Sequence, residues 1–117
     1  MAITKVALTP DTFGFAVNGT SANVSACEEL VATPGAGKYL HLRHVTISSA
    51  AAISITLGSG VNAGAVNNVV LGPIAFAANQ TIQWIFNPSI CLTVNESLTV
   101  DADGAGVITV FAQGFVS

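Results

Sequence analysis

Charge is the property that this sequence has least of. Only 8% of the 117 residues are charged, three lysine or arginine and six aspartate or glutamate, and the net charge is −3. Typical soluble domains carry about 25% charged residues. Three cations do not make the basic patch that nucleic acid requires, nor a polybasic anchor for anionic lipid. We therefore expect neither nucleic acid nor a membrane as a partner.

Signals for secretion and for a disulfide framework are also missing. Residues 1–22 contain no apolar segment of the kind that directs secretion, so we expect the protein to be made in a cytoplasm. The two cysteines, Cys27 and Cys91, are too few for a disulfide framework. One disulfide between them is an alternative, but free cysteines usually pack as small apolar side chains. We expect both to be free and to lie in the core.

No stretch shows the apolar periodicity of a helix of three turns. The apolar residues, 51% of the chain, instead alternate with polar ones over short runs, and turn residues separate these runs at intervals of about 8–12 residues. The clearest run is Ile53–Leu57, in which Ser54 and Thr56 would face outward. The pattern predicts an all-β fold, a single antiparallel β-sandwich of about eight strands, jelly-roll-like, with no substantial helix.

The first 22 residues have two interpretations. They hold short apolar runs, and Asn18–Ser21 has the composition of a turn. The segment is either the first strand of the domain or an arm that reaches a neighbouring subunit through Phe13 and Phe15. In both interpretations residues 23–117 form the sandwich domain.

The middle of the chain, Val45–Asn95, contains no lysine, arginine, aspartate or glutamate over 51 residues. Polar residues interrupt it every few positions, and about 18 consecutive apolar residues occur nowhere, which argues against a membrane span. Its polar positions hold Ser, Thr, Asn and Gln. These can lie against a neighbouring chain without the cost of burying charge. The stretch therefore predicts an assembly surface.

One irregularity of strand register can be predicted. Leu40 and Leu42 alternate with polar residues, but Val45 and Ile47 are offset from them by an odd number of positions. In a regular strand the two pairs would therefore point to opposite faces of the sheet. A β-bulge near Arg43 would bring all four apolar side chains to the core.

Three breaks are expected within the charge-free stretch. Residues 58–65, rich in glycine, predict a flexible loop. Gly72-Pro73 interrupts a strand and suggests that this strand either lies at a sheet edge or bends there. Residues 87–89, Asn-Pro-Ser, are expected to end the strand that begins at Thr81.

The last strand, residues 107–116, has two apolar faces. Ile108 and Val110 belong to one face, and Phe111 and Phe115 to the other. One face would line the core, and the other would form a subunit contact or lie under a covering arm.

The densest polar cluster lies between Tyr39 and His44. Strand alternation would place Tyr39, His41 and Arg43 on one exposed face, and Tyr and Arg contribute strongly to protein interfaces. A metal site would require His41 and His44 to converge, and no third ligand is evident. We therefore expect an interface here, with no metal and no cofactor.

The other candidates for chemistry are interpreted as structure. Asp101–Gly104 begins like a calcium loop but lacks its remaining ligands, which favours a turn. Trp84 alternates with Ile82 and Phe86 as a core residue does, and a sugar-stacking platform with Tyr39 is the alternative. No nucleophile motif and no phosphate-binding glycine loop occurs. We expect no catalytic residues and no enzymatic activity.

A wider pattern spans residues 38–117. Its features, in order, are Gly37-Lys38, Leu40 and Leu42, the Ala/Ser-rich turn 49–52, Ile53–Leu57 with a Gly-Ser-Gly loop, Leu71–Asn79, Phe86-Asn87-Pro88 and Asn95–Val100. This order resembles the small β-sandwich structural proteins of tailed bacteriophage virions, and most of all capsid decoration (cement) proteins. The resemblance implies a jelly-roll-like homotrimer on a capsid surface.

The expected function is that of a non-enzymatic virion protein on the capsid surface, which binds the major capsid protein as an oligomer and stabilises the capsid. The candidate interface residues are Tyr39, His41, Arg43, Phe111, Phe115, Phe13 and Phe15. The alternative is a phage tail or fibre module that recognises a host-surface glycan through Trp84 or the Tyr39 face.

Overall fold

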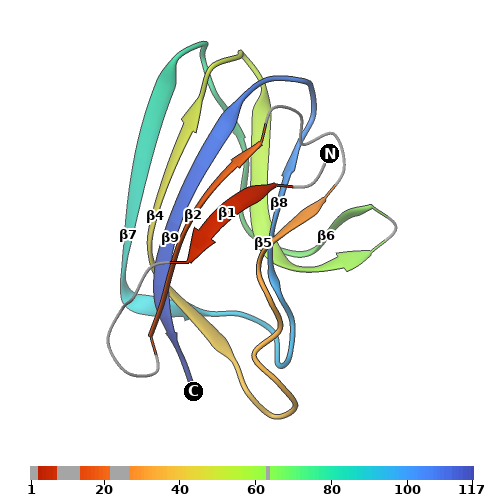
Figure 1. Cartoon of the computed structure of the whole chain (residues 1–117), viewed down its shortest axis with the longest axis vertical. Helices are drawn as coiled ribbons and strands as arrows, with labels where there is room; N and C mark the ends of the chain where they lie inside the picture. The colour runs from red at the N-terminus through yellow and green to blue at the C-terminus, as the bar shows by residue number, and fades with distance from the viewer. Residues whose placement is uncertain (1–2, 8–13, 22–26, 63) are drawn as a thin grey trace.

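Nine strands in two antiparallel sheets make up the computed structural model, which describes residues 3–7, 14–21, 27–62 and 64–117 (Figure 1). The strands are β1 (Thr4–Ala7), β2 (Gly14–Ser21), β3 (Glu28–Val31), β4 (Leu40–Ser49), β5 (Ser54–Asn62), β6 (Ala65–Ala75), β7 (Gln80–Cys91), β8 (Leu98–Ala102) and β9 (Ile108–Val116). The described residues form no helix, and so none that could cross a membrane.

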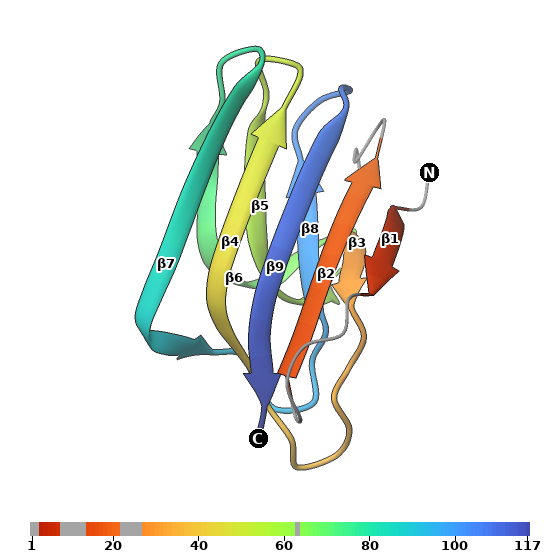
Figure 2. The ribbon, with the colours of Figure 1, turned by 60° about the vertical axis from the view of Figure 1, so that its left-hand side comes forward.

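The order of the strands is that of a jelly roll. The larger sheet runs β1-β2-β9-β4-β7 and the smaller sheet β3-β8-β5-β6 (Figure 2). From β2 onward the strands pair from the two ends of the chain inward: β2 with β9, β3 with β8, β4 with β7, and β5 with β6. The chain is thus one long hairpin rolled into two sheets, with β1 added at one edge. The predicted antiparallel sandwich is confirmed, with nine strands rather than about eight.

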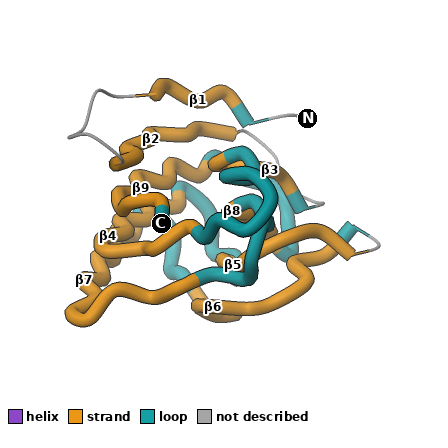
Figure 3. Tube along the Cα trace, turned by 90° about the horizontal axis from the view of Figure 1, so that it is seen from below, coloured by secondary structure: helices purple, strands orange, loops and turns teal. Residues whose placement is uncertain are grey.

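The core lies between the two sheets, which Figure 3 shows end-on as two layers. Strand alternation sends every second side chain into this space. The larger sheet contributes Leu42, Val45 and Val110 to it, and the smaller sheet contributes Leu57 and Val100, all fully buried.

The predicted bulge at Arg43 is confirmed. Opposite β9, Leu42 pairs with Gly114 and His44 with Gln113, so Arg43 is one extra residue in β4. The parity of the strand changes there, as the apolar pattern requires. The four apolar residues on either side of the bulge are all buried: Leu40, Leu42, Val45 and Ile47.

The flexible loop predicted at residues 58–65 is wrong. β5 continues to Asn62 and pairs with β6 through Val61 and Val66. The glycines serve close packing instead, because a Cβ at Gly58 would collide with the backbone of Asn68. Gly60 has a φ of 72° and lies against the Glu96 carboxylate.

The expected strand end at residues 87–89 is also wrong. β7 continues to Cys91, but residues 86–89 do not pair with β4, because His44 pairs with Ile85 and Leu42 pairs with Ile90. We call this unpaired stretch the excursion of β7. Proline is tolerated there because β7 is the edge strand of the larger sheet. The edge position predicted from Gly72-Pro73 is confirmed, since β6 is the outer strand of the smaller sheet.

The described part of the first 22 residues belongs to the larger sheet. β1 pairs with β2, and β2 pairs with β9 from Gly14 to Ser21. The turn predicted at Asn18–Ser21 is therefore wrong, because pairing with β9 overrides the local turn preference. Phe13 lies outside the described residues.

The bulge yields a test of what sets the register. Deleting Arg43 would force one half of β4 to turn its two apolar side chains outward. At about 2–5 kcal/mol for each large core side chain lost, the deletion should remove about 5 kcal/mol or more of the free energy of unfolding. Chemical denaturation measures it. The control R43A keeps the backbone residue and should stay within about 0.5 kcal/mol of wild type; equal stability of deletion and wild type would refute the register argument.

Candidate functional site

The outward side of the larger sheet carries four rows of side chains that run across the strands. Cross-strand pairing defines them as Gly14, Phe115, His41 and Cys91; Ala16, Gln113, His44 and Ile85; Val6, Asn18, Phe111, Thr46 and Gln83; and Thr4, Thr20, Thr109, Ser48 and Thr81. We call this surface the large-sheet face. None of these positions holds a lysine, an aspartate or a glutamate.

Aromatic rings and histidines occupy the middle of the large-sheet face. The rings of His41 and Phe115 stack with centroids 4.4 Å apart and an angle of 3° between the planes. The ring of His44 meets Phe111 edge-on, with centroids 5.5 Å apart. These contacts leave both phenylalanines half-buried. The last strand is therefore buried on its inward side and only partly covered on its outward side.

The bulge places both histidines on the same face. In a regular strand, residues 41 and 44 would point to opposite faces of the sheet. Because Arg43 is an extra residue in β4, His44 instead points outward, like His41. Sequence reasoning missed His44 as an interface residue, although the bulge that it predicted was the signal. Among the described residues, no three His, Cys, Asp or Glu side chains lie close enough to hold a metal ion.

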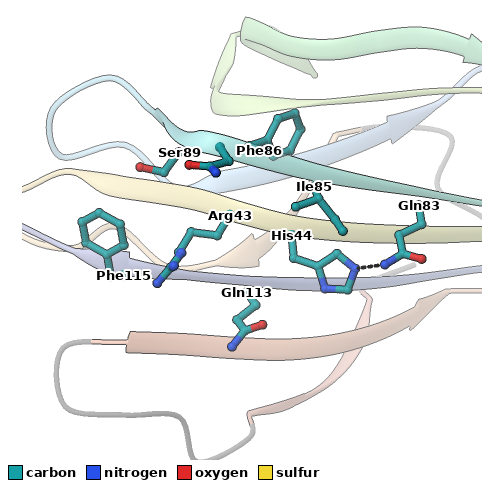
Figure 4. A pocket seen from close by; sticks show the side chains of 9 residues that line it. Arg43, His44, Gln83, Ile85, Phe86, Ser89, Gln113 and Phe115 are labelled. Atoms are coloured by element: carbon teal, nitrogen blue, oxygen red, sulfur yellow. Dashed lines mark hydrogen bonds between the residues drawn. The ribbon is translucent and has the colours of Figure 1, made fainter.

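A hollow of about 760 Å³ opens on the large-sheet face where β7 makes its excursion (Figure 4). Its lining residues are Arg43, His44, Gln83, Ile85, Phe86, Asn87, Ser89, Gln113 and Phe115. We call it the Arg43 hollow. The His44 and Gln83 side chains are hydrogen-bonded through their Nε2 atoms at 2.9 Å. The lining combines amide groups, an arginine and apolar walls, and includes no carboxylate.

The predicted interface residues are only partly brought together. Arg43 and Phe115 line the hollow, and His41 stacks on Phe115. Tyr39 is 39% exposed and lies beside His41, with ring centroids 6.5 Å apart, but does not line the hollow. Phe15 differs, because it pairs with Gly114 on the inward side and packs against the core.

Trp84 and the cysteines also have defined places. Trp84 is half-buried, packs against the core and meets Phe76 edge-on at 6.5 Å, as the core interpretation predicts. Both cysteines are free. Cys27 is half-buried, but Cys91 is exposed in the outermost strand. The expectation that both lie in the core is therefore wrong for Cys91, which pairs with His41 on the large-sheet face.

The acidic side chains that the structure describes lie on the smaller sheet or in the segments that adjoin it. Those described are Glu28 and Glu29 in β3, Glu96 before β8, Asp101 in β8 and Asp103 just after it. We call this region the acidic half; the sixth acidic residue, Asp11, lies outside the described residues.

Two members of the acidic half have structural roles. Glu96 accepts hydrogen bonds from the side-chain amides of Asn67 and Asn68 at 3.2 and 3.0 Å, which ties the β5–β6 hairpin to the segment before β8. Asp103 accepts a hydrogen bond from the Ser54 backbone N–H at 2.8 Å. The turn predicted at residues 101–104 is wrong for Asp101 and Ala102, which belong to β8, while the chain bends at Asp103 and Gly104.

Burial changes the acidity of three groups in this half. It raises the pKa of the Asp101 carboxyl above its usual range, and the nearby Asp103 adds to the rise. Burial likewise raises the pKa of Glu28 and of the Cys27 thiol. One oxygen of Asp101 and one of Glu28 is buried without a hydrogen-bond partner. The ionised forms are thus disfavoured in the folded chain.

Asp101 should make stability depend on pH. Because its pKa is raised on folding, its contribution is most favourable below the unfolded value and is lost as the pH rises through the folded pKa. D101N cannot ionise, so it should gain stability relative to wild type at pH 7 and gain less at pH 3, as measured by denaturant unfolding. E29Q, which removes the same charge at an exposed position, is the control; equal gains for both variants at both pH values would contradict the burial effect.

Comparison with known proteins adds little to this description. No protein-family model matches the sequence, and no curated protein matches it. Among solved structures, a cupin domain from Bordetella pertussis Tohama I is similar, with 7% sequence identity and a TM-score of 0.41 over 95% of this chain and 92% of that chain. The fold assignment rests on the strand order and pairing of the chain itself.

Proposed function

We propose that this chain is a non-enzymatic structural protein of a tailed-bacteriophage virion, a capsid decoration protein that associates with copies of itself, as a homotrimer, and binds the major capsid protein. The observation that carries the proposal is the large-sheet face, whose four rows contain no lysine, aspartate or glutamate. Its hydroxyl and amide groups can be covered by a neighbour without desolvating a charge.

The edges of the sandwich support the same conclusion. β7 and β6 each form one of the two edges of their sheets, lie on the same side of the molecule (Figure 2), and contain no charged residue. Soluble proteins usually protect such edges with lysine or other charges, because unpaired strand edges associate. Ile85 of β7 is 73% exposed and Val69 of β6 is 55% exposed. A protein whose edges are covered in an assembly has no need of that protection.

The action of such a protein is passive. Apolar area buried between subunits contributes about 25 cal/mol per Å², from which the entropic cost of association is subtracted. Many copies bound to one capsid act together, because each attached copy raises the effective concentration of the others at their sites. The phage location, the three-fold symmetry and the capsid partner come from the resemblance of residues 38–117 to decoration proteins.

A second candidate function is glycan recognition by a phage tail or fibre module. The Arg43 hollow favours it, since amide groups, a hydroxyl and the Phe115 ring are the groups with which proteins hold sugars. Trp84 does not support it, because its ring packs toward the core. Glycan binding by a monomeric protein, lost in the Phe115→Ala variant, would favour this candidate over the first.

The mass of the native protein in solution tests the proposal. We expect a mass of about three chains by sedimentation, together with binding to capsids that lack the protein. Ile85→Asp should remain folded, because the side chain is 73% exposed, but should associate at least about tenfold more weakly, since it places a charge in the contact.

Ala36→Asp is the matched control. Ala36 is exposed in the turn between β3 and β4, outside both the large-sheet face and the acidic half, so this variant should associate like wild type. Cys91 is exposed on the large-sheet face. Slower labelling of its thiol in the associated form than in the dilute monomer would therefore give an independent measure of self-association through this face. A wild-type chain that stays monomeric at every concentration and does not bind capsids would refute the proposal.

A further inference from the structure

We propose that the Arg43 hollow receives a carboxylate from the acidic half of a neighbouring copy of this chain. The contact is heterologous: the large-sheet face of one copy meets the smaller sheet of the next. The inference rests on the proposed self-association and adds to it the pair of surfaces that meet.

The cation in the hollow is available to a partner. Arg43 is exposed, and no carboxylate is among the described residues that line the hollow around it. As the bulge residue it lies between the regular outward rows, and it is the only arginine or lysine among the residues that line the hollow. Figure 4 shows its side chain between His44 and Phe115, on the side of Gln113.

The surroundings of Arg43 suit one carboxylate. A guanidinium binds a carboxylate through two parallel hydrogen bonds. The amides of Gln113 and Asn87 and the hydroxyl of Ser89 line the same hollow and can donate further hydrogen bonds. Apolar walls lower the local dielectric and so strengthen a charge pair once the hollow is covered. A single cation on a chain of net charge −3 does not suit a polyphosphate or a nucleic acid.

Charge complementarity selects a second copy as the source of the carboxylate. Every described acidic side chain belongs to the acidic half, on the other sheet, where Glu29 and Asp103 are exposed. If two large-sheet faces met about a two-fold axis, neither copy would bring an acidic residue of its rows to the Arg43 of the other. The head-to-tail arrangement brings opposite charges together, and such heterologous contacts close into rings, including a ring of three.

Charge reversal tests the contact. R43E should weaken self-association by about tenfold or more in sedimentation equilibrium, because a like charge would face the incoming carboxylate. K38E is the matched control: Lys38 is exposed in the segment between β3 and β4, and its reversal changes the net charge equally. It should alter association less than about twofold. Thermal unfolding of each variant checks that the fold is intact.

Rescue by a second reversal identifies the source of the carboxylate. In one chain, R43E combined with E29K and D103K should recover most of the lost association, because the pairing is restored with its signs exchanged. Since Asp103 also binds the Ser54 N–H, R43E with E29K alone is the second rescue variant.

The outcomes separate the two proposals. Equal weakening by R43E and K38E, or weakening by R43E that neither rescue variant reverses, would overturn the heterologous contact while leaving the proposed assembly in place. A wild-type chain that never associates would overturn the proposed function itself.

Discussion

The structure depends on one extra residue in β4. Without Arg43 the apolar residues on its two sides would point to opposite faces of the sheet, and only one pair could reach the core. With it, both pairs are buried. The same change of parity turns His44 outward beside Phe111, and opposite it β7 leaves the ladder between Ile85 and Ile90. The core and the Arg43 hollow are therefore two results of a single irregularity.

The second organising feature is the separation of charge between the sheets. The charge-free residues 45–95 supply the second half of β4, together with β5, β6 and β7, and so both edge strands on one side of the sandwich. The described carboxylates lie on the smaller sheet and its adjoining segments, where Glu96 and Asp103 make hydrogen bonds that hold loops in place. A nearly neutral surface and an acidic surface thus belong to one small molecule. The proposed contact between copies follows from that asymmetry.

The fold could be predicted from sequence where side-chain alternation was the dominant signal. The parity conflict between Leu42 and Val45 located the bulge, because burial of one sheet face specifies register strongly. Glycine and proline were less reliable guides. Gly58 was interpreted as a loop residue but permits close approach of the Asn68 backbone within a hairpin. Pro88 was interpreted as a strand end but sits in the excursion of an edge strand.

The candidate site was less predictable than the fold. Tyr39, His41 and Arg43 were grouped by alternation alone, but the bulge moves Arg43 out of that alternation and brings in His44. The hollow depends on the excursion of β7: residues 87–89 signalled a break in the strand, but not that the strand would resume and that Asn87 and Ser89 would line a hollow with Gln83. Cys91 was expected in the core because free cysteine usually is, yet an edge strand exposes it. Sites formed by long-range pairing leave little trace in local sequence.

The pairing of the first strands with the last has a consequence for biosynthesis. β9 lies between β2 and β4 in the larger sheet, so that sheet cannot close until β9 has left the ribosome. Until then the paired strands β4 and β7 have both of their outer edges open, and Arg43 is the single charged residue of the two strands. Such intermediates aggregate readily. Rapid insertion of β9 therefore protects the nascent chain from the same associations that the folded protein is proposed to use.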